Sequence, residues 1–157
     1  MPEKIRVAIS GGGVAGASVL HALLKYPQID AHIFESAPKF KEAGVAFGIT
    51  RNASKALELM GPSAPKCLER AGGVQMQGVR FFLAQGKGAG DLIYEADNKQ
   101  QGKQTTTIVQ RANFLHELLA DIPGERMHAS KRLEKVDKQA NGSLLLHFAD
   151  GSTHACE

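Results

Sequence analysis

The sequence predicts an α/β fold with a parallel sheet, followed by an antiparallel β-meander. An apolar strand at Lys4–Ile9 leads through a glycine cluster and a helix to a second strand at Ala31–Glu35, which is the pattern of a βαβ unit. Near the C-terminus, Asn141-Gly142 and Asp150-Gly151 separate three short segments that are predicted to be strands, as hairpin turns do. Because no repeat or low-complexity tract interrupts this order, one architecture is expected over 1–157.

The first half of the chain follows from apolar periodicity and turn residues. In Lys4–Ile9 three β-branched residues alternate with other residues, one of which is the apolar Ala8, and this predicts a strand buried on both faces. Leucines recur at helical spacing in Ala17–Lys25, and Pro27 prevents that helix from continuing. A short helix is predicted at Ser54–Met60.

The middle of the chain is predicted to form a hairpin. Val79–Ala84 and Asp91–Glu95 have strand composition and are joined by a glycine-rich turn, which favours an antiparallel pair. The next segment, Asp97–Thr106, is polar and is expected to be a mobile loop. Thr50 and Asn52 are candidate N-caps for the helix predicted at Ser54–Met60.

The last third is predicted to contain a helix at Arg111–Ile122, a short strand at Arg126–Ala129 and the meander. Asn-Gly and Asp-Gly at the two meander turns indicate type I′ turns, in which both central residues have positive φ. The meander strands are Arg132–Asp137, Ser143–Phe148 and Thr153–Cys156.

Composition and charge narrow the classes of partner. The 157 residues are 43% hydrophobic, 22% charged and 6% aromatic, which is typical of a globular protein. The longest apolar stretch, Val14–Leu24, is far shorter than the roughly 20 residues of a membrane span, so no membrane is expected as partner. The net charge of +3 comes from scattered residues without a basic block, and nucleic acid is not expected either.

The cysteines and histidines favour a reducing compartment and no metal site. Cys67 and Cys156 lack a CxxC spacing and no secretory segment precedes them, so we expect reduced thiols and a cytoplasmic protein. The six histidines show no HxxxH, HExxH or Cys/His spacing. His147 and His154 can approach Cys156 across a hairpin, but we interpret them as surface strand residues.

The glycine cluster has the spacing of a phosphate-binding turn. Gly11, Gly13 and Gly16 satisfy GxGxxG between a strand and a helix whose N-terminal N–H groups favour an anion. Glu35 ends the second strand 19 residues after Gly16, where a carboxylate can accept hydrogen bonds from ribose and repel a 2′-phosphate. The predicted ligand is therefore FAD or NAD. The alternative is a glycine-rich turn with an incidental surface glutamate.

Arginine and phenylalanine residues leave further alternatives open. Arg111 opens a predicted helix, where a cation opposes the helix dipole unless it faces an anion such as a phosphate. A solvated, exposed side chain explains Arg111 equally well. We interpret Phe114 as a core residue, whereas Phe81 and Phe82 suit either a core or contact with an aromatic ligand.

Four segments together resemble a known family. They are VAISGGGVAGASVLHALL, HIFESAPKFKEAGVAFGITRNASKALELMG, TIVQRANFLHELLADIPGERMHASKRLEKVD and LHFADGSTHACE. Over nearly the whole chain and in consistent order, they are similar to the N-terminal part of the salicylate-hydroxylase-like, FAD-dependent aromatic monooxygenases. The most specific element is Glu35 combined with EAGVAFGITRNA and QRANFL, which NAD-dependent Rossmann enzymes lack, and this favours FAD over NAD.

The resemblance implies a Rossmann-like FAD-binding domain of the glutathione-reductase type, truncated within 1–157, with 74–100 as the beginning of a substrate-binding sheet. Glu35 would bind the adenosine ribose, and Arg111 would reach the FAD phosphate and ribityl region. No catalytic residue is assigned. The remaining implied cofactor contacts are the diphosphate-binding Gly11, Gly13, Val14, Ala15 and Gly16, and the backbone of Gly44 and Val45 near the flavin.

The resemblance also implies an activity, the hydroxylation of a phenolic or other aromatic small molecule with NAD(P)H and O₂. Family members continue well beyond the position equivalent to Glu157, so this chain is expected to be inactive alone. A noncatalytic dinucleotide-binding or oligomerisation module is the alternative. An NAD-dependent reductase is a third reading, which Glu35 allows but the segment after it disfavours.

A missing fourth strand would leave one edge of Lys4–Ile9 without a partner. In a doubly wound sheet this first strand lies between the second and the fourth. An unpaired apolar edge invites pairing with another chain. We therefore expect a homodimer or strand exchange through this edge, or a fragment of a longer chain.

Overall fold

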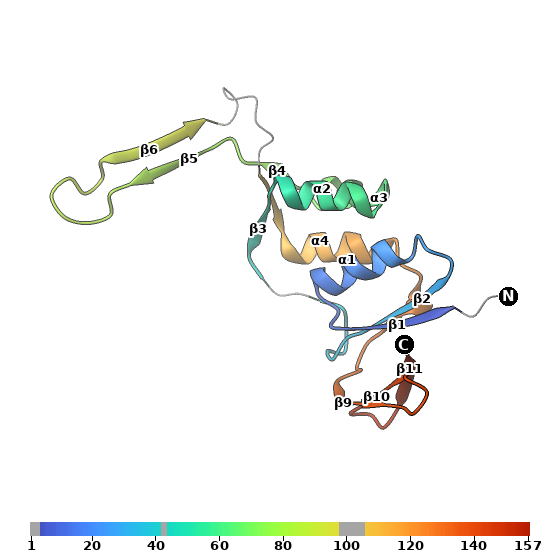
Figure 1. Ribbon diagram of the computed structural model, residues 1–157. Coiled ribbons are helices and arrows are strands. Elements are labelled where there is room, and N and C mark those ends of the chain that lie inside the picture. Colours follow the sequence, from blue (N-terminus) through green and yellow to red (C-terminus); the bar gives the residue numbers. More distant parts are fainter. Residues whose placement is uncertain (1–3, 42–43, 98–105) are drawn as a thin grey trace.

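A three-stranded parallel sheet in the order β1-β2-β8 lies between a helical layer and an antiparallel meander in the computed structural model (Figure 1). The structure describes residues 4–41, 44–97 and 106–157. β1 (Ile5–Ser10) and β2 (Ile29–Phe34) pair in parallel over their full lengths, and β8 (Met127–His128) pairs with the end of β2. α1 (Val14–Leu23) connects β1 with β2. The predicted α/β fold with its βαβ unit is confirmed.

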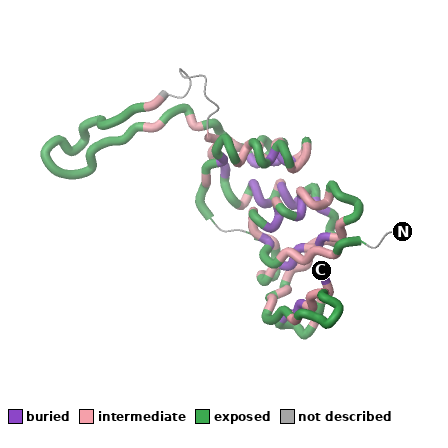
Figure 2. The backbone as a smooth tube through the Cα atoms, viewed as in Figure 1, coloured by how far each residue is buried: buried purple, intermediate pink, exposed green. Residues whose placement is uncertain are grey.

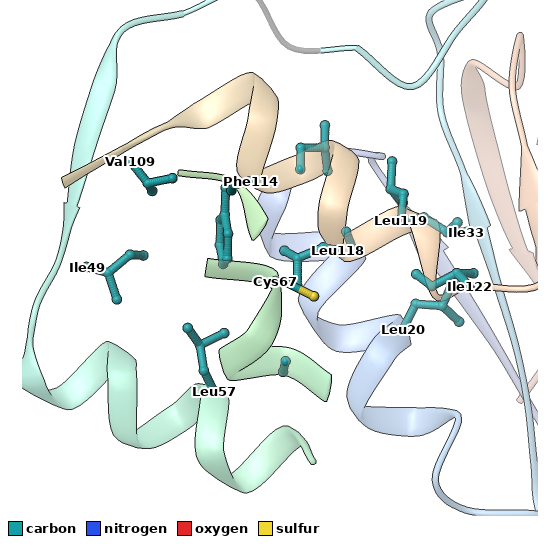
Figure 3. Packing of buried hydrophobic residues seen from close by; sticks show 14 of the residues in the cluster. Leu20, Ile33, Ile49, Leu57, Cys67, Val109, Phe114, Leu118, Leu119 and Ile122 are labelled. Atoms are coloured by element: carbon teal, nitrogen blue, oxygen red, sulfur yellow. The ribbon is translucent and has the colours of Figure 1, made fainter. Parts of the chain in front are cut away.

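Four helices cover one face of this sheet. α1 packs beside α4 (Arg111–Ala120), while α2 (Arg51–Met60) and α3 (Ser63–Arg70) lie on the outer side of this pair (Figure 1). Their apolar faces meet β2 in the helix-side core, part of which Figure 3 shows. The helix-side core consists of Ala17, Leu20, Ala31, Ile33, Ile49, Leu57, Ala64, Cys67, Ala71, Val109, Phe114, Leu115, Leu118, Leu119 and Ile122.

The meander covers the other face of the sheet. β9 (Leu133–Lys138), β10 (Leu144–Phe148) and β11 (Thr153–Cys156) form an antiparallel sheet in the order β11-β10-β9, as predicted. Because side chains alternate along a strand, β2 turns Ile33 toward the helices and Phe34 toward the meander. The meander-side core consists of Phe34, Leu146, Phe148 and Cys156.

The meander turns are not of the predicted type I′. Gly142 and Gly151 have φ of 89° and 81°, but neither Asn141 nor Asp150 has positive φ. Gly142 N–H instead donates to the carbonyl of Gln139 at 2.9 Å, which closes a turn before the glycine. Only one residue of each turn therefore adopts the left-handed conformation, and the hairpins were predicted correctly with the wrong turn chemistry.

A further antiparallel sheet, besides the meander, was not predicted. β3 (Ala46–Ile49), β7 (Thr107–Gln110) and β4 (Val74–Gln75) form an antiparallel sheet in the order β3-β7-β4. These strands are short, and β3 and β7 pair across more than 50 residues of sequence, so no local sequence pattern predicts them. This sheet positions the start of α4, which follows β7 directly.

The predicted hairpin is confirmed as β5 (Gly78–Phe82) and β6 (Leu92–Asp97), which pair antiparallel. It extends away from the rest of the molecule and is exposed over most of its length (Figures 1 and 2). The ring of Phe81 faces that of Tyr94 at 6.0 Å, yet these side chains are 55% and 54% exposed. The expected mobile loop at Asp97–Thr106 falls, over 98–105, outside the described residues.

β1 is less buried than the sequence predicted. No residue of β1 is fully buried, and Ile5 is 53% exposed. The physical reason is that β1 is an edge strand, since among the described residues only β2 pairs with it as a strand. On its other edge, Glu157 N–H donates to the carbonyl of Arg6 at 3.0 Å, and the Glu157 carboxylate accepts from the Arg6 N–H at 2.5 Å.

None of the described helices has the length and hydrophobicity that crossing a bilayer requires.

Candidate functional site

The turn between β1 and α1 requires glycine at specific positions. Gly11 has φ of 110° and its N–H donates to the carbonyl of Phe34 at 2.8 Å, which joins the turn to the end of β2. A Cβ atom on Gly16 would overlap the carbonyl oxygen of Gly11. A Cβ atom on Gly12 would lie 2.6 Å from the Phe40 ring. The turn is therefore closed tightly from inside the fold, as a phosphate-binding turn is.

The first turn of α1 is free to receive an anion. Gly13 is the N-cap, and no side chain caps the helix among the described residues. The first intrahelical hydrogen bond runs from Ala17 N–H to the carbonyl of Gly13 at 3.0 Å, so the N–H groups of Val14, Ala15 and Gly16 have no partner within the helix. Unpaired N–H groups at the positive end of a helix dipole favour a phosphate.

Glu35 points into this turn. One carboxylate oxygen, Oε2, accepts the Gly12 N–H at 2.6 Å, while Oε1 accepts the Ala37 N–H at 2.8 Å and the Ser36 hydroxyl at 3.0 Å. The Ala37 N–H and then the Gly12 N–H hold the pKa of the Glu35 carboxyl below its ordinary value, so it is ionised at neutral pH. A carboxylate offers about four acceptor positions. These three hydrogen bonds leave one on Oε2, available to a hydroxyl group.

Gly44, Val45 and Arg111 come together at a second place. The register of β3 with β7 pairs Ala46 with Gln110, which brings the residues before β3 beside the start of α4. A Cβ atom on Gly44 would lie 3.7 Å from the Arg111 Cδ. Val45 is 85% exposed, so its backbone is open on the surface.

Both groups lie on the same side of the molecule. The carboxyl ends of β1 and β2 and the first turns of α1 and α4 are all at the left in Figure 1. α1 and α4 pack side by side, so their N-termini point to the same side of the molecule (Figure 1). Ligands of open α/β sheets bind at the carboxyl ends of the strands, and this edge is such a place.

Sequence reasoning missed two contributors to the turn. The GxGxxG pattern places no requirement on Gly12, yet Glu35 and Phe40 leave no room there for a side chain. Phe40 packs on the turn from a segment without regular structure, so no periodicity marked it. A run of three consecutive glycines was the available signal, since GxGxxG alone needs only two of them.

The histidines and phenylalanines can also be placed. Phe114 is a core residue, as interpreted, and Phe81 and Phe82 are exposed. The interpretation of His154 as a surface residue is wrong, because its ring lies 4.8 Å from that of Phe34 between the meander and the parallel sheet. His147 lies 3.0 Å from Asp137 on the neighbouring strand. Within the described ranges, no group of three potential ligands could hold a metal ion.

The fold is that of FAD-dependent monooxygenases. A putative FAD-containing monooxygenase from Photorhabdus luminescens superimposes with a TM-score of 0.78 at 20% identity, over 98% of this chain and 38% of that one. A salicylate hydroxylase in complex with substrate gives a TM-score of 0.74 at 23% identity, over 99% and 35%. Klebsiella pneumoniae HpxO R204Q, complexed with FAD, gives 0.75 at 21% identity, over 98% and 38%.

Curated relatives are salicylate hydroxylase-like, FAD-dependent monooxygenases. The 6-methylsalicylate 1-monooxygenase atA of Aspergillus terreus is 33% identical over 165 residues, covering 99% of this chain and 36% of the relative. The salicylate hydroxylase asL1 of Sarocladium schorii is 30% identical over 161 residues, covering 96% and 33%. The chain thus spans about a third of the length of these relatives. No protein-family model matches the chain.

Proposed function

We propose that this chain binds FAD and forms the nucleotide-binding part of a monooxygenase that hydroxylates a phenolic or other aromatic small molecule with NAD(P)H and O₂. The observation that carries the proposal is the convergence of an uncapped helix start and an ionised Glu35 on one glycine turn. The homologues, several of them salicylate hydroxylases, support the substrate class. The chain spans about a third of their length, so we expect no hydroxylation by this chain alone.

The residues of the turn fit the adenosine diphosphate half of FAD. The close approach of Gly16 to Gly11 excludes any larger residue and keeps the turn tight, and the N–H groups that follow Gly13 would donate to the diphosphate oxygens. Glu35 would accept a hydrogen bond from a ribose hydroxyl through its remaining acceptor position. Its negative charge disfavours a 2′-phosphate.

The second group would serve the other half of the cofactor. Gly44 and Val45 would present backbone to the flavin, and Arg111 would neutralise phosphate charge or contact the ribityl chain. FAD, when bound, supplies the electron transfer and the activation of O₂, whereas the protein orients the substrate and excludes water.

The hairpin β5–β6 is proposed as the beginning of the substrate-binding sheet, within 74–100. An isolated two-stranded hairpin is marginally stable in water, and its exposed apolar residues are expected to pack against further strands or another partner. The exposed apolar residues of the hairpin include Phe81, Phe82, Ile93 and Tyr94.

Titration of the purified chain with FAD tests the function, with flavin fluorescence or calorimetry as the readout. Glu35→Ala is expected to weaken binding by about 1.5–3 kcal/mol, or roughly 10- to 150-fold in Kd, the scale of charge-assisted hydrogen bonds. Glu134→Ala, which removes an exposed carboxylate on β9, is the matched control. An unchanged Kd for Glu35→Ala would refute the ribose role. Failure to take up FAD or NAD would favour the noncatalytic module.

The open edge of β1 is proposed to pair with a strand of a second copy. Odd-numbered residues of β1 bond toward β2, as Ile5 N–H does to the Gln28 carbonyl at 2.9 Å, so the backbone groups of Ala8 and Ser10 face the other edge, beyond the point where Arg6 is bonded to Glu157. Glu157 engages Arg6. Light scattering at micromolar concentration is expected to show a dimer, and Ala8→Pro to return it to monomer by removing an N–H at this edge. A monomer at all concentrations contradicts this pairing.

A further inference from the structure

Three histidines from distant parts of the sequence meet where the meander packs against the parallel sheet. His32 lies on β2, His128 on β8 and His154 on β11, and we call them the histidine cluster. The rings of His32 and His128 are stacked with centroids 5.1 Å apart, and the centroids of His32 and His154 are 5.5 Å apart. All three side chains are partly buried.

Phe34 is the centre of this junction. Its ring lies 4.8 Å from the rings of His128, His154 and Phe148, so imidazoles surround a residue of the meander-side core. Two strands of the parallel sheet and two of the meander contribute to this stack. The histidine cluster is therefore part of what holds the two sheets together.

The hydrogen bonds that join His32, His128 and Arg126 are satisfied by neutral rings. His32 Nε2 lies 3.1 Å from Arg126 Nη1, and a guanidinium can only donate, so Nε2 must be an acceptor without a proton. The proton of His32 is then on Nδ1, which lies 2.9 Å from His128 Nε2 and must donate to it. The Nε2 of His154 is buried and has no hydrogen-bond partner among the described residues. A second proton on either bonded ring would place two N–H groups against each other.

Several charges face the histidine cluster from the surrounding elements. Asp30 Oδ1 lies 3.6 Å from His32 Nε2, but it also accepts a hydrogen bond from Arg126. Burial lowers the pKa of all three imidazoles, with nearby cations and the other histidines adding to the effect for His128 and His154. Glu125 opposes it at His32. The charged groups are Asp30 on β2, Glu125 and Arg126 on η1 (Gly124–Arg126), Lys131 after β8, and Arg6 on β1, itself paired with Glu157.

The junction is connected directly to the candidate nucleotide site. Phe34 precedes Glu35 in the chain, and the Glu35 N–H donates to the carbonyl of His128 at 2.8 Å. The carbonyl of Glu35 accepts the Lys131 N–H at 2.7 Å. A displacement of His128 or Phe34 would thus move the backbone that carries the Glu35 carboxylate.

We propose that the histidine cluster is a proton-operated joint, which holds the meander to the parallel sheet when neutral and loosens it when protonated, and thereby weakens nucleotide binding at Glu35. The last step rests on the proposed function, whereas the joint itself does not.

The direction of the pH dependence follows from linkage. The folded state disfavours protonated histidine, so the unfolded chain binds more protons once the pH falls below the ordinary histidine pKa of about 6.5. The stability contributed by the histidine cluster is present above that pH and is lost as the pH decreases toward the lowered values. Above about pH 5 carboxylates with ordinary or lowered pKa remain largely ionised, which keeps their contribution separate.

Urea unfolding between about pH 7.5 and pH 5 tests the joint in the intact chain. The unfolding constant is expected to rise as the pH falls, and to rise at least about threefold less in His154→Phe, which keeps an aromatic ring against Phe34 but cannot be protonated. His154→Gln is the second variant if His154→Phe does not fold. His116→Gln, an exposed histidine on α4, is the control and should behave as the parent protein. An equal pH dependence in parent and His154 variants would overturn the proposal.

FAD titration at the same pH values tests the connection to Glu35. The Kd of the parent is expected to rise as the pH falls, and to change less in His154→Phe. A pH-dependent stability with a pH-independent Kd would overturn the connection. If no FAD binds at any pH, the proposed function fails, while the unfolding experiment still decides the joint.

Discussion

The two faces of the parallel sheet are packed with different chemistry. The helix-side core is mainly aliphatic, with Phe114 and Cys67 among its members, and draws on four helices and three strands, with Leu118 and Leu20 fully buried. The meander-side core has only four buried residues, and its borders are completed by imidazole rings. One face is thus held mainly by apolar packing, with the buried His21 of α1 bonded to Ser63 of α3, and the other by ring contacts that depend on protonation.

The two kinds of packing allow a small sheet to combine stability on one face with a response to pH on the other. Dense aliphatic packing resists local opening, because every displaced side chain leaves a cavity. A thin core next to titratable rings opens at lower cost, and the elements that respond to ligands or protons are drawn from such regions. The glycine turn between β1 and α1 lies at the end of both faces, since Ile33 and Phe34 immediately precede Glu35, which bonds to Gly12.

A matched pair of leucine substitutions tests this comparison most strongly. Leu118→Ala on the helix side is expected to destabilise the protein by about 3–5 kcal/mol, because its surroundings cannot collapse into the cavity. Leu146→Ala on the meander side is expected to cost about 2–3 kcal/mol, since a three-stranded sheet can move inward. Urea denaturation measures both. Equal losses would show that the two faces are packed alike.

Hydrogen exchange sharpens the comparison in a second way. As the pH falls through the range below about 6.5, amides of β10 should lose protection, after correction for intrinsic exchange, whereas amides of α4 should keep theirs. The reason is that burial lowers the pKa of His128 and His154, whose rings lie between the parallel sheet and the meander. A parallel loss in both elements would mean that the sheet opens as one unit.

A glycine substitution tests a meander turn, and a second glycine in η1 serves as its control. Gly142→Ala is expected to destabilise by about 1–2 kcal/mol, because Gly142 has φ of 89° and a side chain is strained there even in open space. Gly124→Ala also enters open space but lies outside the positive-φ region, so it should be neutral or stabilising by up to about 1 kcal/mol. Thermal unfolding compares the two. A neutral Gly142→Ala would contradict the assigned turn conformation.

The smallest effect is expected on the hairpin. Phe81→Ser should change the free energy of unfolding by less than about 0.5 kcal/mol, because Phe81 contributes to neither core. It should, however, reduce self-association of the exposed apolar surface, which light scattering at rising concentration measures. A large loss of stability would place the hairpin within the cooperative unit of the two cores.

Local patterns predicted the parts of the fold that are local in sequence. The βαβ unit, Glu35 and the meander hairpins follow from spacing and turn residues. β3 and β7 could not be predicted, because each has four residues and gains its hydrogen bonds from the other. The approach of Gly44 to Arg111 came only through the family resemblance. His32, His128 and His154 share no spacing, and only the packing of two sheets brings them together.

The two cysteines lie on opposite faces of the parallel sheet. Cys67 is fully buried on the helix side and Cys156 is buried on the meander side, and both are free thiols. Burial also raises the pKa of the Cys67 thiol, so little thiolate forms there in the folded state. Labelling with a thiol-reactive dye, followed by mass spectrometry, would therefore measure without any engineered label how often local opening exposes the thiol on each face of the sheet.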